Sequence, residues 1–532
     1  MSQEIGALNE IYSWVARSIL PSEEYAYYYD GERIVDGHTE FLIHDKYKLP
    51  RAESTVGISI LGHLDRILPI RETQDPPAII AVLAAFTCQG DPWTTPEACT
   101  KACAILALTV PYAPTDKIFL ADLLGNILAH TVTPAFSRNK NLTPGRRFES
   151  TLSGQEDKPW KKDRVYAVTV LHWVLSQYPP SDKKLIEGHF NLLYRPVLML
   201  IRDHSSFFRV RGCDLLSQLL APIEASGSEI LSARELGPQF QADIKPVLHS
   251  LPSLTSEDES LRLLSAAYPA LLLVIRATYP LPYGLPKIKL DPMDPVDRVP
   301  IYGSDEKSNH RQSWLKNVLA EAIIPSYRHI GSSSAAENTS ISSFPYPRLS
   351  TFLLSQICLV LRELGIYSCQ YTQGLMPLLS AALTNPFGTS FLPLLAAAVE
   401  TLRCLILNAW PTISGYRGEI LEAVGSCWIN LMKAEGELSP APGGSTHKNG
   451  SEENAGKPHD LGHANMREGI EGLMVELRDV IKFLKVVVDF SNANFEGASN
   501  GNRAFAINFM AELDSLAEAD PRLRLLFTIG SN

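Results

Sequence analysis

The segment from Arg195 to Leu220 constrains the fold more than any other part of the chain, because its apolar residues follow two helical stripes. Asp203 separates the stripes, and Ser205 or Ser206 can cap the second helix. Two such stripes must face each other, so the segment predicts two antiparallel helices. The stripe residues are Leu193, Val197, Leu200 and Ile201 in the first helix, and Phe208, Gly212, Leu216 and Leu219 in the second.

A helix pair of this size cannot bury both of its apolar sides alone, so it needs neighbours on both flanks. Its spacing is that of a HEAT repeat, and a weaker echo follows at 375–407, where Asn385 and Pro386 separate two apolar helices. Helical periodicity runs through nearly the whole chain, and strand-like alternation is almost absent. The sequence therefore predicts an all-α fold, an α-solenoid of HEAT-like antiparallel helix pairs with disordered inserts.

Breaks in the periodicity divide the chain, and prolines such as Pro222 and Pro269 are expected at or near helix ends. The expected regions are N-terminal helices over 1–135, a linker loop over 136–160, helix pairs over 161–277, a Pro-rich connector over 278–307, further helix pairs over 308–434, a disordered insert over 435–464 and terminal helices over 465–532.

Composition excludes several classes of function. The 532 residues carry a formal net charge of -10, which argues against nucleic acid as the main ligand. A basic cluster that includes Lys158, Lys161 and Lys162 is expected to be a solvated loop. None of the eight cysteines stands in a Cys-x-x-Cys pair, so Cys99 and Cys103 are expected to be buried free thiols, with no metal and no cofactor.

The location of the protein is predicted from two further features. The N-terminus has no basic region followed by an apolar one, and no segment carries about 20 unbroken apolar residues. We therefore expect no membrane partner, and a place in the cytoplasm and nucleus.

Three residues of the first helix pair are candidates for a structural or binding role. Asp203 in the short loop and Arg209 early in the second helix are expected to bridge successive repeats, with two independently solvated charges as the alternative. An exposed ion pair contributes only ~0–1 kcal/mol, so its role would be to fix register. Gly212 is expected to let the second helix approach the first closely.

A second group of candidates lies between 402 and 432. Pro411 ends one apolar helix, Ser414 can cap the next, and Trp410 falls at the junction, where it closes a layer of helices or contacts a partner. Tyr416 and Arg417 follow on a short turn that could present a polar rim.

One segment suggests catalysis. Asp291, Asp294 and Asp297 are spaced by three, as in the carboxylate ladders that hold magnesium in all-α enzymes. Such ladders need a helix, and the prolines between these acids disfavour one. We keep a magnesium-dependent enzyme as a remote alternative and expect a protein that is not an enzyme.

Three passages carry a resemblance to a known family: VTVLHWVLSQYPP at 168–180, RPVLMLIRDHSSFFRVRGCDLLSQLL at 195–220, and AWPTISGYRGEIL with a later Cys-Trp between Ala409 and Trp428. With them the chain resembles the second type of Tel-two-interacting protein, the smallest subunit of the TTT co-chaperone complex, over about 160–435. The chain departs from that pattern at Arg202, where the family has an acid, and at Thr412, where it has a basic residue.

The resemblance implies a non-catalytic scaffold whose partners are the two larger helical-repeat subunits of the complex. Indirectly it implies the ninety-kilodalton heat-shock chaperone and phosphatidylinositol-3-kinase-related kinases, including TOR and the DNA-damage kinases. The alternative is another HEAT-repeat adaptor, in nuclear transport or ribosome assembly. The positions that fit the family pattern are Asp203, Arg209, Trp410, Pro411, Tyr416, Arg417 and Trp428.

Overall fold

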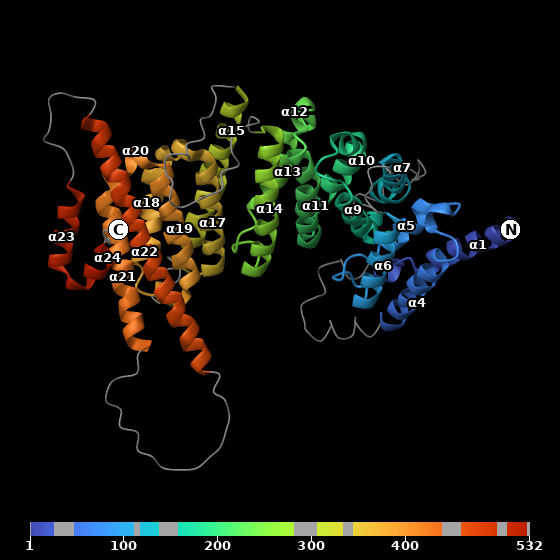
Figure 1. The fold of residues 1–532 in the computed structure, drawn as a ribbon, viewed down its shortest axis with the longest axis horizontal. Helices are drawn as coiled ribbons and strands as arrows, with labels where there is room; N and C mark the ends of the chain where they lie inside the picture. Colours follow the sequence, from blue (N-terminus) through green and yellow to red (C-terminus); the bar gives the residue numbers. More distant parts are fainter. Residues whose placement is uncertain are drawn as a thin grey trace, which may run out of the picture. The chain divides into compact units, whose positions relative to one another are not determined.

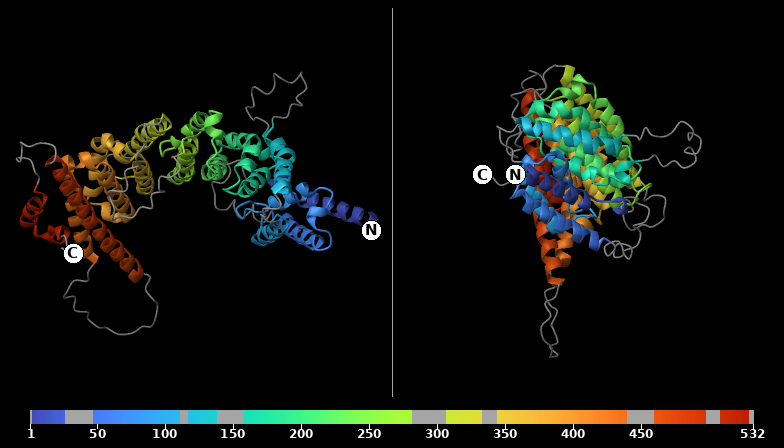
Figure 2. Two further views of the ribbon diagram at one scale, coloured as in Figure 1. Left: turned by 45° about the horizontal axis from the view of Figure 1, so that its top comes forward. Right: turned by 90° about the vertical axis from the view of Figure 1, so that its right-hand side faces the viewer.

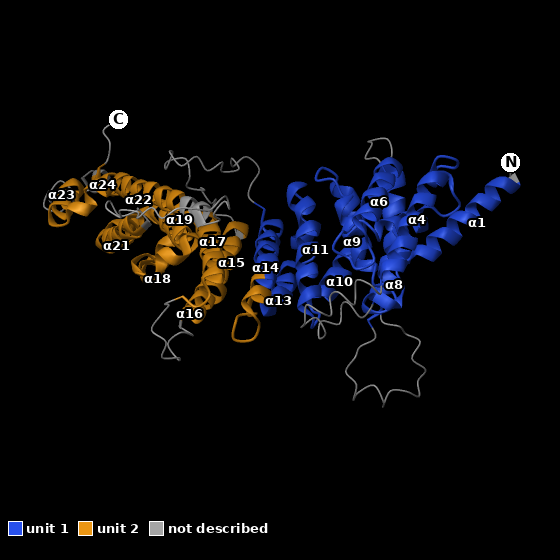
Figure 3. Cartoon of the chain, turned by 90° about the horizontal axis from the view of Figure 1, so that it is seen from below, with its two compact units in different colours: residues 1–247, 262–280 blue, residues 248–261, 281–532 orange. Residues whose placement is uncertain are grey.

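A computed structural model describes residues 2–25, 47–110, 117–137, 158–280, 306–332, 344–438, 459–496 and 508–528. Every regular element in these ranges is a helix, which confirms the all-α prediction. The helices form two compact units, Met1–Val247 with Arg262–Pro280 and Leu248–Leu261 with Leu281–Asn532 (Figure 3). Most of the predicted linker, connector and insert, and all of 291–297, lie outside the described residues.

The first unit contains the helices up to α14 (Figure 1). They are α1 (Ser2–Ile19), α4 (Lys48–Asp65), α5 (Pro76–Ala84), α6 (Pro96–Thr109), α7 (Lys117–Ile127), α8 (Thr133–Phe136), α9 (Ala167–Ser176), α10 (Lys183–Ile201), α11 (Ser206–Ala225), α12 (Ile230–Ala233), α13 (Gly237–Leu248) and α14 (Glu257–Thr278), with short 3-10 turns at Glu23–Tyr25, Ile70–Glu72 and Pro159–Lys161. The start of α14 belongs to the second unit.

The remaining helices belong to the second unit. They are α15 (Glu306–Asn317), α16 (Ile324–Ser332), α17 (Pro347–Leu364), α18 (Thr372–Thr384), α19 (Leu392–Asn408), α20 (Trp410–Ile413), α21 (Arg417–Leu438), α22 (His459–Glu496), α23 (Phe509–Ala519) and α24 (Arg524–Phe527), with 3-10 turns at Gly365–Tyr371, Gly388–Phe391, Ser414–Tyr416 and Pro521–Leu523.

Local sequence explains where several helices begin. Asp75, Thr95 and Asp182 cap α5, α6 and α10, each accepting a hydrogen bond from the backbone N–H three residues later, at 3.2, 3.0 and 3.3 Å. Prolines occupy the first turn of α5, α6 and α17, where a missing N–H leaves no hydrogen bond unmade. Gly365 ends α17 with a φ of 54°, a backbone conformation that glycine adopts without steric cost.

Two helices are widened by a π turn. Leu128–Val132 joins α7 to α8, and Val318–Ile323 joins α15 to α16. A proline follows each turn within two residues, at Pro134 and Pro325. The wider turn relieves the clash between the proline ring and the carbonyl four residues earlier, so the helix continues past the proline.

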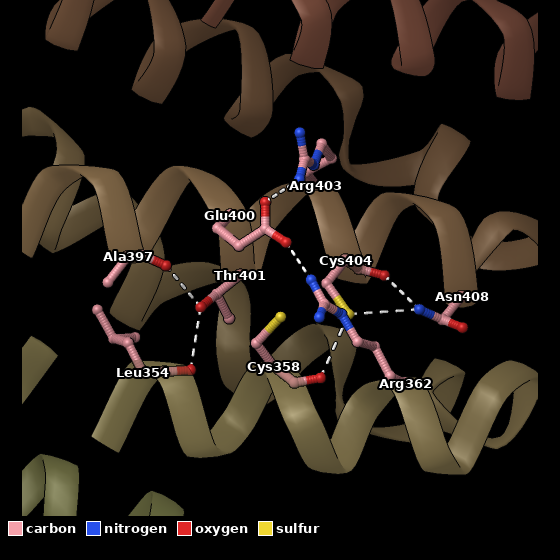
Figure 4. A network of polar contacts seen from close by, with 9 residues as sticks. All are labelled: Leu354, Cys358, Arg362, Ala397, Glu400, Thr401, Arg403, Cys404 and Asn408. Atoms are coloured by element: carbon pink, nitrogen blue, oxygen red, sulfur yellow. Dashed lines mark hydrogen bonds and ion pairs between the residues drawn. The ribbon is translucent and has the colours of Figure 1, made fainter. Parts of the chain in front are cut away.

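Within the second unit, a long helix packs on the second long helix after it in the chain. Thus α17 packs on α19, α19 on α22, and α18 on α21 (Figures 1 and 2). Thr401 Oγ1 donates to Leu354 O at 3.1 Å and Cys404 Sγ to Cys358 O at 3.4 Å (Figure 4). Residue numbers rise together along this contact, so α17 and α19 run parallel, with α18 returning the chain between them.

Polar contacts support this parallel contact at its edge. Glu400 of α19 pairs with both Arg362 of α17 and Arg403 one turn along its own helix (Figure 4). Asn408 donates to Cys404 O at 2.8 Å. The ion pair between Glu400 and Arg362, with the hydrogen bonds of Thr401 and Cys404 to α17 carbonyls, fixes the register of the two helices.

The first unit repeats the same order of contacts. In it α1 packs on α5, α4 on α6, α5 on α7, α8 on α10 and α9 on α11. Helices adjacent in the chain also pack on each other, and the most extensive such contact joins α10 and α11. The antiparallel pair predicted over 195–220 is therefore present.

Gly212 lies where α11 comes closest to α10. A Cβ atom at this position would stand 2.6 Å from Ile201 N and 3.0 Å from Leu200 C, both of which are backbone atoms of α10. These atoms cannot move aside as a side chain can, so only glycine permits the observed approach. Tight packing at Gly212 was expected from its position in the apolar stripe.

Some details of the predicted helices are wrong. Pro222 lies in the last turn of α11, near its end as expected, but Pro269 lies in the middle of α14. Ser205 occupies the N-cap position of α11 but makes no side-chain cap bond, and Ser414 lies in a 3-10 turn ahead of α21. Pro246 likewise lies inside α13.

Four helical stretches are long and apolar enough to cross a membrane by length and composition: Lys117–Phe136, Glu257–Thr278, Pro347–Thr384 and Gly388–Asn408. Between 39% and 67% of each apolar window is buried among the other helices. Pro347–Thr384 also contains the turn at Gly365. The absence of a membrane partner stays a prediction.

Gly212→Ala is expected to destabilise the first unit. Alanine raises helix propensity by about 1 kcal/mol, but overpacking against backbone costs about 1–3 kcal/mol, so we expect a net loss of up to about 2 kcal/mol in chemical denaturation. Gly188→Ala on α10 is the control, because its Cβ meets nothing within 4 Å, and it should stabilise the protein. Equal effects of the two substitutions would contradict the close-approach argument.

Candidate functional site

Asp203 is the centre of a buried charged cluster in the loop between α10 and α11. Its side chain is fully buried, and its carboxylate contacts Lys158 Nζ at 2.9 Å and Lys161 Nζ at 2.8 Å. The backbone N–H of Ser205 donates to Oδ1 at 2.8 Å. Arg209 Nε donates to the backbone carbonyl of Asp203 at 2.6 Å. We call Asp203, Lys158 and Lys161 the Asp203 cluster.

Aromatic rings hold the two lysines in place. Trp160, between them in the chain, stacks on Phe136 of α8 with ring centroids 4.8 Å apart. Lys161 Nζ lies 5.0 Å from the ring centroid of Phe208 on α11. The segment before α9 is therefore fastened both to α8 and to the loop of the α10–α11 pair.

The charge of Asp203 depends on these partners. Burial by itself raises the pKa of a carboxyl group, but hydrogen bonds from Lys161, Lys158 and the Ser205 backbone outweigh it and lower the pKa of Asp203 below its ordinary value. Asp203 is thus an ionised group in the interior, stabilised by two ammonium groups whose side chains are 17% and 20% exposed.

The structure changes the predicted picture of this loop in two respects. Asp203 and Arg209 do not form an ion pair. Arg209 donates instead to the backbone carbonyl of Asp203, so this contact stays within one helix pair. Lys158 and Lys161, expected in a solvated loop, are mostly covered and carry the charge pairing. At the neighbouring position Arg202 forms two hydrogen bonds with Asp243 of α13, at 2.7 and 2.8 Å.

A second cluster of side chains joins the C-terminal helices to one another. Trp428 of α21 is fully buried, and its indole Nε1 donates to Arg522 O at 3.1 Å. The guanidinium of Arg478 on α22 lies 5.0 Å from the Trp428 ring centroid and donates to Leu525 O at 3.1 Å. Trp428 is therefore a core residue around which α21, α22 and the 521–527 segment assemble.

Arg417 extends this attachment to α23. Its guanidinium makes a two-pronged contact with Glu512, with Nε 3.0 Å from Oε2 and Nη2 2.9 Å from Oε1. Nη1 donates to Ser414 O at 3.2 Å. We call Trp428 and Arg417 with their partners Arg522 and Glu512 the terminal-helix cluster.

The other motif residues of this region are more exposed. Trp410 is half-buried and meets Phe490 of α22 edge to face, with centroids 5.1 Å apart. Pro411 is exposed in the first turn of α20, and Tyr416 is half-buried in the 3-10 turn. Whether these three residues contact a partner stays a prediction.

The chemistry of the described residues is that of a packed interior. No group of three or more His, Cys, Asp or Glu side chains within the described ranges is placed to hold a metal ion. Burial raises the pKa of the Cys213 and Cys427 thiols to about 12, so neither is a ready nucleophile. Cys99 is buried as expected, whereas Cys103 is exposed.

Reasoning from sequence missed the partners in both clusters. Lys158 is 45 residues from Asp203, and Arg522 is 94 residues from Trp428, so no local spacing connects them. One signal was available at the first cluster. A tryptophan in the polar run Lys158–Pro159–Trp160–Lys161 indicates a buried anchor, which places the adjoining lysines close to the core.

Removing both lysines should leave the Asp203 carboxylate buried and unpaired. We expect Lys158→Met with Lys161→Met to lower the free energy of unfolding by about 3 kcal/mol near neutral pH. Adding Asp203→Asn to this double variant should restore much of the loss. Exposed Lys183, which pairs with Glu187 at 3.8 Å, is the control, and Lys183→Met should have little effect.

The same cluster predicts a pH dependence. Because the folded-state pKa of Asp203 is lowered, its stabilisation is complete above the unfolded value near 3.8 and is lost as the pH falls through the folded value. Asp203→Asn should therefore flatten the pH dependence of unfolding below about pH 4. Parallel wild-type and variant curves in that range would contradict the lowered pKa.

Trp428→Ala should loosen the terminal helices more than loss of the Arg417 contact does. Truncating a buried tryptophan costs about 3–5 kcal/mol, whereas a partly exposed ion pair contributes ~0–1 kcal/mol. Hydrogen–deuterium exchange over 509–527 should rise strongly in Trp428→Ala and only slightly in Glu512→Gln. The opposite order would show that Arg417 and Glu512 dominate the attachment.

Comparison with known proteins gives one match. No curated protein and no solved structure matches the chain. The model of the Tti2 family matches residues 79–390, more than half of the 532 residues. The matched range includes Asp203, Arg209 and Gly212, and it ends before Trp410. The chain belongs to the Tti2 family.

Proposed function

We propose that the chain is a non-catalytic scaffold subunit of the TTT co-chaperone complex. In this role it supports the chaperone-dependent folding, stability and assembly of phosphatidylinositol-3-kinase-related kinases, in the cytoplasm and nucleus. Membership of the Tti2 family carries the proposal. Its partners are the two larger helical-repeat subunits, with the heat-shock chaperone and its kinase clients as indirect partners.

The arrangement of helices is consistent with a scaffold. In HEAT-like stacking, the first helices of successive pairs pack on one another, and so do the second helices. Contacts between α17 and α19, and between α18 and α21, follow that order in the second unit, as do those of α8 with α10 and α9 with α11 in the first. We infer that each unit is a short solenoid of such pairs.

The buried charges also suit a scaffold. A HEAT pair has few side chains that specify how it sits on its neighbours, and apolar contacts alone tolerate sliding. The Asp203 cluster joins three elements at one fixed geometry, so it sets register at little net gain in stability. The two clusters are thus positioning devices for helices, and we assign no catalytic residue.

Purification of the tagged full-length chain from native extract tests the proposal. Two larger helical-repeat proteins should co-purify at near-equal stoichiometry, and their kinase clients should fall in abundance when the chain is depleted. Recovery of transport or pre-ribosomal factors without the two larger subunits would overturn the proposal in favour of another adaptor role.

A further inference from the structure

Helix α4 lies near the N-terminal end of the first unit (Figures 1 and 3), and it carries a stripe of exposed apolar residues. Successive residues of an α-helix are about 100° apart around its axis, and on this basis the residues of the stripe fall within a sector of roughly 40°. Ile67 continues the stripe in the turn after the helix. The stripe residues and their exposed fractions are Leu49 at 69%, Val56 at 59%, Ile60 at 38% and Ile67 at 68%.

The other faces of α4 are already occupied. Thr55 lies 3.1 Å from Thr95 at the start of α6, and Lys101 of α6 donates to Ser59 at 2.8 Å. On the side facing α1, Gly57 packs against Ile19. The stripe is turned away from α6 by about a third of a turn. The stripe therefore lies on a face of α4 that the described helices leave exposed.

Helix α1 packs beside one end of the stripe. The Tyr12 hydroxyl donates to Leu68 O at 2.8 Å, so the middle of α1 lies beside the end of α4 that carries Ile60 and Ile67. Trp14 is 67% exposed, but it lies about 160° around α1 from Tyr12 and so faces away from α4. The exposed apolar surface is therefore that of the α4 stripe, and a contiguous apolar patch of this kind marks an interaction site.

The charges around the stripe indicate what would cover it. Lys48 and Arg66 are exposed on the flank of α4 next to the stripe, in a chain whose net charge is -10. Across the stripe, Glu53 is the exposed acid on α4. A helix with an apolar face and acidic residues along one edge complements this surface, and a second copy of the same basic flank does not.

We propose that the stripe on α4 docks an amphipathic helix of a partner protein, apolar on one face and acidic along one edge. This inference rests on the proposed function, because it assigns the docked helix to one of the two larger subunits of the complex. The docked helix extends the stack of layers by one. The stripe precedes residues 79–390, which the family model matches. The family match therefore gives no support to this docking surface, and the proposal depends on the surface itself.

The test compares two pairs of substitutions in the full-length chain, mixed with the purified larger subunits. Val56→Gln with Ile67→Gln alters the stripe, and we expect its dissociation constant to rise by about tenfold or more. Val475→Gln with Val486→Gln on α22 is the matched control, because these residues are also eleven apart and are 52% and 50% exposed. The control should bind as the wild type does.

Two further measurements address the occupant. Lys48→Glu with Arg66→Glu should weaken binding and reduce its salt dependence, because the acidic edge would lose its basic partner. Hydrogen–deuterium exchange over 48–67 should fall when the larger subunits are added, while melting temperatures of all variants stay near that of the wild type.

Each other outcome overturns the docking surface. If the wild type binds the larger subunits and the stripe variant binds equally well, the proposed function stands and the surface is wrong. If the stripe substitutions lower the melting temperature, the chain itself covers the stripe. If they convert a dimer to a monomer in mass photometry, a second copy covers it. A wild type that binds neither subunit overturns the function and the docking surface together.

Discussion

The structure depends on one constraint, which is that a pair of antiparallel helices cannot bury the apolar residues on both of its sides. Every long helix therefore needs a neighbour beyond its own pair, and the contacts between alternate helices supply it. The distance between two packed helices matters for stability because the helices are in contact along their whole length. At Gly212 the approach reaches the backbone of α10 itself, and a single methyl group is enough to disturb it.

Polar groups at these contacts determine how the layers align. Apolar packing between α17 and α19 would tolerate a shift along the helix axis, but the hydrogen bonds from Thr401 and Cys404 to backbone carbonyls of α17 would then be lost. The Asp203 cluster imposes the same condition in the first unit, more strictly, since an unpaired carboxylate in the interior is costlier than an unmade neutral hydrogen bond. Register is thus specified by a few buried polar atoms.

The sequence predicted the helices far better than it predicted the sites. Apolar periodicity is a local property, and it identified the pair over 195–220 and most long helices. It placed some prolines wrongly, since Pro269 lies inside α14 and not at its end. The partners of Asp203 and Trp428 are 45 and 94 residues away, and only the folded chain brings them together. Asp203 was expected to be exposed because it lies in a loop, but it is buried beneath Lys158 and Lys161.

The residues that carry the family resemblance divide between the interior and the surface. Asp203 and Trp428 are fully buried and Gly212 faces backbone, so these positions determine the shape of the subunit. Pro411 is exposed, and Trp410 and Tyr416 are half-buried, so a partner can reach them as it can reach the exposed side chains on α4. Packing and recognition therefore depend on different residues of the same chain, and a shared fold specifies only the first of them.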